Sequence, residues 1–292
     1  MPFDSETPKE FHTAPLVRLT SDGSWQTCLA HSRSHHLLIW ITRGQGRLLL
    51  NGMQRGFGLH SVIFIPAGAL WAADFNRQCL GQVLFMSGPL LSPFPDAPVH
   101  KRFASLQEQT GLAGHFEAIS REQDAQQPHW TRAVQARCEL AAVALHRHPD
   151  NTGKQSTGKH SAAQRLSRAY CQRIACPQAG HHSMAAHAAA LNVTPTHLTR
   201  VCKSVTGKTA AALLTERQLH AARSLLIKSE LPIRDIASRL GFGSAAYFTR
   251  FIAQHTGQTP SGLRDSAQNR MQQPEASQNS GNRTNQAAIF GL

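Results

Sequence analysis

Long apolar runs, closely spaced cysteine pairs and acidic residues in the second half are all scarce in this sequence of 292 residues. The longest nearly apolar stretch, residues 62–73, contains Pro66 and is shorter than the roughly 20 residues that span a bilayer. The polar and partly acidic start, residues 1–6, lacks the basic and apolar pattern of a secretory signal. The six cysteines include no CxxC pair, which is typical of reduced thiols. We therefore expect a cytoplasmic protein with no membrane partner.

Charge is distributed unevenly along the chain. Residues 1–159 hold 15 basic and 12 acidic side chains, whereas residues 160–292 hold 15 basic and only 5 acidic ones. A basic second half predicts a polyanionic partner such as nucleic acid. The patterns GxGxxG, GxxxxGK[ST], GxSxG and HExxH do not occur. The sequence therefore predicts no catalytic residues, no cofactor and no enzymatic activity.

The first half of the sequence has the pattern of short β-strands. Residues 1–15 carry three prolines and mixed charge, which predicts a flexible arm. Between residues 35 and 86, short apolar runs alternate with turns such as Gly44-Gln45-Gly46 and Pro66-Ala67-Gly68. Short strands at this spacing favour an antiparallel barrel or sandwich. Apolar periodicity then predicts helices over residues 102–126 and 130–147.

The second half reads as helices joined by short turns. Residues 149–160 have the composition of a linker, which places a domain of residues 16–148 before it. Residues 161–265 form the predicted all-α domain. Residues 266–292 are rich in Gln, Asn and Ser, so we expect a disordered tail. The fold class is therefore α+β, with an antiparallel β-barrel followed by a helical domain.

An internal repeat of 50 residues is the most informative feature of the second half. The stretch beginning at Thr194 matches the stretch beginning at Ser244, and both residue types are good helix N-caps. Asn192 and Gly241 precede them at turn positions that require a left-handed backbone. Each copy is thus predicted to be a helix-turn-helix unit. One copy would be a weak signal, but two in register within the basic half favour DNA binding.

The repeat also predicts which side chains meet DNA. A helix over residues 210–228 joins the copies, so their second helices could occupy successive major grooves about 34 Å apart. Arginine pairs with guanine, and alanine or threonine methyl groups contact thymine. The candidates for base edges are Thr196, Thr199, Arg200, Ala245, Ala246, Thr249 and Arg250, and those for phosphates are Ser183, Lys203, Lys208 and Ser244. The alternative to base contacts is that Arg200 and Arg250 are solvated or form ion pairs within the protein.

Residues 233–251 read Ile233-Arg-Asp-Ile-Ala-Ser-Arg-Leu-Gly-Phe-Gly-Ser-Ala-Ala-Tyr-Phe-Thr-Arg-Phe. Together with residues 255–264, they resemble the signature of AraC/XylS-type transcriptional regulators. The resemblance covers about residues 183–265. It implies a DNA-binding domain of seven helices with two helix-turn-helix units, promoter DNA as the partner, and base contacts at the positions named above.

The first half is similar, less specifically, to the cupin-like sensor domain common in that family. The turns containing Gly44 and Pro66 fall where a cupin has its two motifs, and His35-His36 precede them. Metal-binding cupins need two histidines and a glutamate, then a third histidine where this chain has Trp71. We therefore predict a metal-free barrel. Trp40 and Trp71 are candidates for the wall of a ligand pocket, or else ordinary core residues.

The combined pattern predicts a DNA-binding transcriptional regulator, such as an activator, whose first domain senses an unknown small-molecule effector. A second copy of the chain is an expected partner, and RNA polymerase is a further candidate. One alternative is a metal-dependent cupin isomerase or dioxygenase with a DNA-binding appendage, which the missing ligands disfavour. Another is a DNA-repair methyl acceptor, which the absence of a four-cysteine zinc cluster disfavours.

Overall fold

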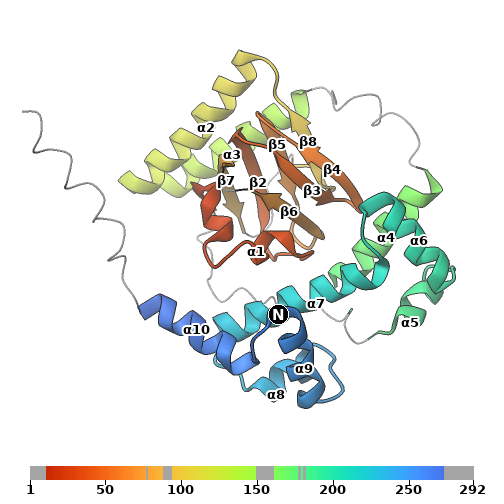
Figure 1. Cartoon of the computed structure of the whole chain (residues 1–292). Coiled ribbons are helices and arrows are strands. Elements are labelled where there is room, and N and C mark those ends of the chain that lie inside the picture. The colour runs from red at the N-terminus through yellow and green to blue at the C-terminus, as the bar shows by residue number, and fades with distance from the viewer. Residues whose placement is uncertain are drawn as a thin grey trace, which may run out of the picture.

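The computed structural model describes residues 11–76, 78–87, 94–148, 161–176, 179 and 182–272. A sheet-rich part, residues 11–148, carries two long helices on one side (Figure 1). A helical part, residues 161–272, packs against another side of the sheets (Figure 1). We call these the N-terminal domain and the helical domain. The predicted linker at residues 149–160 lies outside the described residues.

The strands form two antiparallel sheets. One sheet has five strands in the order β1-β7-β2-β5-β8, and the other has three in the order β4-β3-β6. Their bounds are β1 Phe11–Pro15, β2 His36–Arg43, β3 Gly46–Leu50, β4 Met53–Phe57, β5 Ser61–Ile65, β6 Trp71–Phe75, β7 Leu80–Met86 and β8 Val99–Arg102. The sequence predicted an antiparallel barrel. Within the described residues, the hydrogen-bonded pairings keep the strands in two separate sheets rather than one closed barrel.

Both faces of the five-stranded sheet are buried, which explains its nearly continuous apolar strands. Side chains alternate along a strand, so Leu37 and Ile39 of β2 point into the space between the sheets. Leu38 and Trp40 point the other way, toward the helices α2 (Leu106–Ala125) and α3 (Trp130–Arg147). The N-terminal domain therefore has two apolar layers, one on each face of this sheet.

The remaining helices and their bounds are η1 Leu16–Thr20, α1 Trp25–Cys28, α4 Ala162–Ala175, α5 Met184–Ala189, α6 Pro195–Thr206, α7 Ala210–Lys228, α8 Ile233–Arg239, α9 Ala245–Thr256 and α10 Pro260–Gln272. Side chains cap several of them. Ser105 and Glu108 form a reciprocal capping box at the start of α2, and Ser161 and Gln164 form one at the start of α4. None of the helices in the described part of the chain is long and apolar enough to cross a membrane.

Two predicted boundaries are wrong, because residues assigned to the arm and to the tail belong to regular elements of the fold. Residues 11–15, assigned to a flexible arm, form β1 and pair with β7, with Phe11 opposite Met86. The amide of Thr13 also donates to Gln123 Oε1 of α2 at 2.8 Å. The predicted tail from residue 266 instead continues α10 to Gln272, and Ala267 is buried. Residues 273–292 lie outside the described residues.

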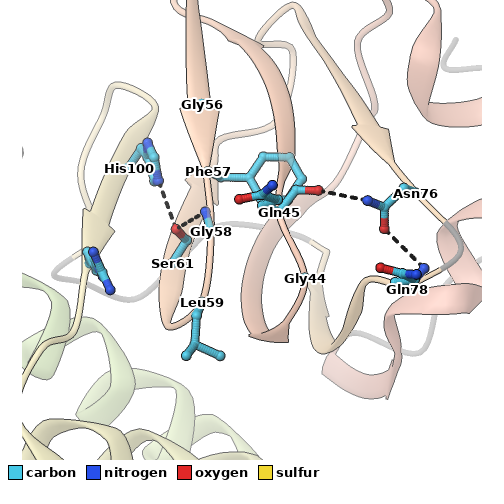
Figure 2. A pocket seen from close by; sticks show the side chains of 11 residues that line it. Gly44, Gln45, Gly56, Phe57, Gly58, Leu59, Ser61, Asn76, Gln78 and His100 are labelled. Carbon is cyan, nitrogen blue, oxygen red and sulfur yellow. Dashed lines mark hydrogen bonds between the residues drawn. The ribbon is translucent and has the colours of Figure 1, made fainter.

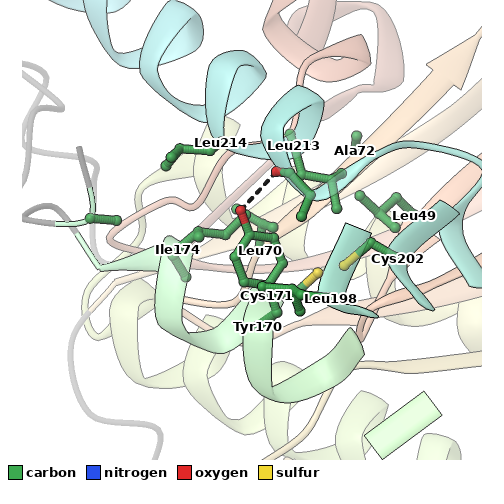
Figure 3. Packing of buried hydrophobic residues seen from close by; sticks show 14 of the residues in the cluster. Leu49, Leu70, Ala72, Tyr170, Cys171, Ile174, Leu198, Cys202, Leu213 and Leu214 are labelled. Carbon is green, nitrogen blue, oxygen red and sulfur yellow. Dashed lines mark hydrogen bonds between the residues drawn. The ribbon is translucent and has the colours of Figure 1, made fainter. Parts of the chain in front are cut away.

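The outer face of the three-stranded sheet is covered by the helical domain. Leu49 of β3 and Ala72 of β6 share one buried cluster with Tyr170 and Ile174 of α4 (Figure 3). The Tyr170 hydroxyl donates to the carbonyl oxygen of Ala210 at 2.7 Å, which ties α4 to the start of α7 (Figure 3). The two domains therefore share a hydrophobic core and stabilise each other.

The turn between β3 and β4 packs closely against α4, so a substitution in this turn tests the shared core. Gly52 has a φ of 70°, and a Cβ there would lie 2.7 Å from the Arg168 backbone. We expect Gly52→Ala to lower the free energy of unfolding by about 1–3 kcal/mol, since it adds left-handed strain and a clash. Gly58→Ala is the matched control, because a Cβ at Gly58 meets nothing within 4 Å. Equal urea denaturation curves for the two variants would contradict this packing.

Candidate nucleic-acid interface

The first helix pair, α5 and α6, is built by local capping. The Ser183 hydroxyl accepts a hydrogen bond from the amide of Ala186 at 3.2 Å and begins α5. Asn192 adopts the left-handed conformation in the turn, with a φ of 55°. The Thr194 hydroxyl then accepts from the amide of His197 at 3.2 Å, and Pro195 occupies the first position of α6. The turn residue and the cap that the sequence indicated for α6 are confirmed.

The second helix pair, α8 and α9, repeats this construction. Gly241 has a φ of 80°, which supplies the left-handed turn. The Ser244 hydroxyl accepts from the amide of Tyr247 at 3.1 Å and begins α9. Both turns therefore use a residue that tolerates positive φ, followed by a hydroxyl cap. The internal repeat seen in the sequence is thus a repeat in three dimensions.

The burial pattern of α6 and α9 also repeats at 50 residues. Leu198 and Phe248 are fully buried at equivalent positions. Arg200 and Arg250 are exposed on the opposite faces. Each of these helices therefore packs on one side and leaves the other open to a partner.

The predicted base-edge residues all lie on these open faces. Thr196, Ala245 and Ala246 are exposed, while Thr199 and Thr249 are partly buried beside them. None of the seven belongs to a buried core cluster. The structure thus brings together three candidates on α6 and four on α9.

Arg200 is held in place within its own helix. Its Nη2 atom lies 3.2 Å from His197 Nδ1, one helical turn away. The equivalent neighbour of Arg250 is Tyr247, which is more than half exposed. The two open faces are therefore similar but not identical.

The four predicted phosphate residues have different surroundings. Ser183 and Ser244 are exposed helix caps, and Lys203 is exposed on α6. Lys208 instead binds Glu216 of α7, with Nζ 2.6 Å from Oε1. A phosphate would have to compete with this carboxylate for Lys208.

Helix α7 connects the helix pairs through two separate apolar contacts. Leu213 and Leu214, in its first half, pack with α4 and α6. Leu225 and Leu226, in its second half, pack with α8 and α9. Because protein interiors are close-packed, this shared helix sets the spacing and orientation of the open faces of α6 and α9.

The N-terminal domain also holds α7, a contact that the sequence did not predict. The ring of His220 on α7 stacks on the ring of His31 at 4.0 Å between centroids, and His31 packs against Trp71. The guanidinium of Arg223 lies 4.6 Å from the centre of the Trp25 ring. No local pattern could have revealed this contact, because its partners are far apart in the sequence.

The two tryptophans proposed as pocket residues are core side chains. Trp71 is fully buried between the sheets, and Trp40 packs against Phe116 of α2 at 6.0 Å between ring centroids. Neither side chain lines the cavity beside Gly44 and His100 or the one beside Pro66 and Arg168. The structure therefore favours the alternative assignment of both as core residues. In the same residues, no group of three or more His, Cys, Asp or Glu is arranged to hold a metal ion.

Known proteins resemble the part of the chain that carries these helix pairs. A family model described as a helix-turn-helix domain matches residues 187–266. Residues 187–266 form an AraC-type helix-turn-helix domain. This AraC-type domain runs from α5 into α10 and so contains both open faces and the connecting helix.

Two curated relatives match the chain over short stretches. The bifunctional transcriptional activator/DNA repair enzyme AdaA of Bacillus subtilis is 35% identical over 71 residues, which are 24% of this chain and 34% of AdaA. The HTH-type transcriptional regulator ExsA of Pseudomonas aeruginosa is 41% identical over 58 residues, which are 20% of this chain and 21% of ExsA. The chain thus spans about a third and a fifth of the lengths of these two relatives.

A solved structure matches over a longer range at low identity. The crystal structure of ToxT from Vibrio cholerae O395 is 12% identical, covers 87% of this chain and 96% of its own, and has a TM-score of 0.38.

The stacked histidines predict how the stability of the protein depends on pH. Burial, followed by neighbouring positive charges, holds the pKa values of His31 and His220 well below their usual range. The unfolded chain therefore binds more protons below about pH 6.5, and the free energy of unfolding should fall as the pH decreases from about 7 to about 5. Each histidine contributes a slope of at most about 1.4 kcal/mol per pH unit.

Urea denaturation across this pH range measures the slope. His220→Gln should reduce it, because the variant lacks one of the buried histidines whose pKa is lowered. His146→Gln removes an exposed histidine on α3 and should leave the slope close to that of the wild type. If both variants keep the wild-type slope, the stacked pair is not the source of the pH dependence.

Proposed function

We propose that this protein is a sequence-specific DNA-binding transcriptional regulator without catalytic activity of its own. The observation that carries the proposal is the duplicated open face, on α6 and on α9, inside an AraC-type domain. Each face belongs to the second helix of a helix-turn-helix unit, which is the helix that enters a major groove in such units. The net positive charge of residues 160–292 supports a DNA partner.

The proposed complex has α6 and α9 in successive major grooves on one side of the duplex. Arg200 and Arg250 are the proposed guanine contacts, since a guanidinium can donate two hydrogen bonds to the guanine edge. The threonines and alanines beside them supply methyl groups for thymine. Lys203 and the amides at the helix starts capped by Ser183 and Ser244 are the proposed phosphate contacts.

The N-terminal domain is the proposed sensor and dimerisation domain. It touches α7, the helix that sets the spacing of the two DNA-binding helices, through the His31–His220 stack. A small molecule that binds better to one arrangement of this contact would shift the population of DNA-binding states. Helices α2 and α3 are the proposed surface for a second copy, with Leu106 and Leu140 exposed on them.

Substitution of the two arginines tests the base contacts. We expect Arg200→Ala and Arg250→Ala each to weaken binding to the preferred duplex by about 1–3 kcal/mol, because each removes a contact to a base edge. The preferred duplex is first selected from a random-sequence library with the wild-type protein, and affinities are measured by fluorescence anisotropy. Each variant should also relax the preference at one base pair.

Arg18→Ala is the matched control, because Arg18 is exposed on η1 of the N-terminal domain and lies outside the proposed α2–α3 surface. Its affinity and preferred sequence should equal those of the wild type. Unchanged selection by both Arg200→Ala and Arg250→Ala would refute the assignment of base contacts.

Salt dependence tests the phosphate contacts. Binding of the full chain to the selected duplex should weaken linearly on a log–log plot against salt concentration, because bound cations are released from DNA. For about six phosphate contacts, the affinity should fall about a thousandfold between roughly 50 and 200 mM salt. Lys203→Gln should reduce the slope by about one without changing the preferred sequence. A salt-independent affinity is incompatible with the proposed role of the basic half.

A further inference from the structure

A cavity of about 690 Å³ opens at one end of the N-terminal domain (Figure 2). Its wall is formed by the turns after β2, β4 and β6 and by strand β8, which are far apart in sequence. This volume lies within the range of small-molecule sites in proteins. The cavity is distinct from the open faces of α6 and α9 and from the His31–His220 contact.

Strand register shows that polar side chains on β5 and β8 face inward here. Ser61 of β5 pairs with Arg102 of β8, and Ile63 pairs with His100. Cross-strand partners project to the same face of a sheet. Because Ile63 lies in the apolar core between the sheets, its partner His100 and, two residues away, Ser61 share its inward face. Arg102 has the same register at the end of β8, where its side chain is exposed and lines the cavity.

Strand β4 brings a further cation to the same end. Arg55 pairs with Leu48 of β3, whose side chain is fully buried between the sheets. The Arg55 side chain therefore shares the inward face with Phe57, two residues away at the cavity wall. Burial, followed by the positive charge of Arg55, lowers the pKa of His100 to about 4.

The serine and the histidine form an ordered pair at this wall. His100 Nε2 lies 3.2 Å from Ser61 Oγ, which also accepts a hydrogen bond from the amide of Gly58 at 3.1 Å (Figure 2). On the far side, the Asn76 side chain donates to the carbonyl oxygen of Gln45 at 3.2 Å and accepts from the amide of Gln78 (Figure 2). These hydrogen bonds fix the conformation of the cavity rim, so that it is preorganised for a ligand.

The cavity has positive charge with no balancing carboxylate among its described residues. No Asp or Glu lines it, and no ion pair joins Arg55 or Arg102 to a carboxylate in the described part of the chain. Arg55 is partly buried, and burial lowers its pKa. A partly buried cation is costly unless an anion accompanies it. A bound anion would supply that partner.

We infer that this cavity binds a small organic anion, whose carboxylate or phosphate group is held by Arg102 at the cavity wall beside the Ser61–His100 pair, with Arg55 of the adjoining strand β4 as a second cation on the same inward face. Guanidinium groups recognise both kinds of anion by paired hydrogen bonds. The side-chain amides of Gln45 and Gln78 line the same cavity and suit hydroxyl or carbonyl groups on the rest of the ligand. Phe57 supplies an apolar wall.

Strand β8 also connects this cavity to the end of the domain. Lys101, between the two cavity residues, faces the other way, and its ammonium donates to the carbonyl oxygens of Leu145 and His148 at 3.0 and 2.7 Å. His148 ends α3, immediately before the segment that leads to the helical domain. A regulatory effect of the anion rests on the proposed function above, whereas the binding site itself does not.

Thermal unfolding and calorimetric titration of the full chain test the inference. The probes are succinate, citrate, inorganic phosphate and glycerol 3-phosphate, each at up to about 10 mM. Succinamide and glycerol serve as neutral counterparts. We expect at least one anion to raise the Tm saturably, while the neutral molecules do not. Carboxylate or phosphate specificity among the responding probes identifies the anionic group.

Matched variants locate the bound anion. Arg55→Gln and Arg102→Gln should each weaken binding of the responding anion by about tenfold or more. Arg55→Lys keeps the charge, so it should fold even if Arg55→Gln does not, and should bind with intermediate affinity. Arg47→Gln is the control, since Arg47 is exposed on the outer face of β3, one residue from inward-facing Leu48. It should bind like the wild type.

Two results would overturn the inference: no response to any anion, or an equal response in Arg47→Gln and both cavity variants. Affinity for the selected duplex, measured on the same preparations without anion, separates this site from the proposed function. Arg55→Gln and Arg102→Gln should bind DNA like the wild type. A wild-type chain that binds the anion but no DNA would refute the proposed function and leave the anion site standing.

Discussion

The burial of α7 by several partners at once is the contact on which the rest of the structure depends. Its first half packs with α4 and α6 in the cluster shared with the three-stranded sheet, and its second half packs with α8 and α9. Near its middle, His220 stacks on His31 of the N-terminal domain. Since a close-packed helix cannot shift without moving its neighbours, the spacing of the two helix pairs depends on the docked N-terminal domain.

In the N-terminal domain, the side chains on the two faces of a strand contact different parts of the structure. In β2, alternate side chains serve the layer between the sheets and the layer under α2 and α3. In β8, the same alternation places His100 and Arg102 at the cavity and Lys101 at the end of α3. Because side chains alternate with a period of two, one strand can connect a polar cavity to a helix end without any intervening element.

Much of the helical domain could be predicted because its signals are local. Thr194 and Ser244 accept hydrogen bonds from amides only three residues ahead, and Asn192 and Gly241 mark the turns just before them. The apolar stripes of α6 and α9 repeat within one helix. The strands were visible as short apolar runs, yet their division into two sheets and the ordering of residues 11–15 depend on pairing with partners such as β7, which lies far along the chain.

The amino-acid sequence by itself determined the duplicated helix pairs, their caps and the excess of positive charge beside them, because each depends on neighbouring residues or on composition. Only the tertiary structure decided that Trp40 and Trp71 are core residues, that Arg55 and Arg102 occupy inward register positions of β4 and β8, and that His31 meets His220. The physical reason is strand register and domain packing. Both join residues that are distant in the chain, and a one-residue change of register would turn every strand side chain to the opposite face.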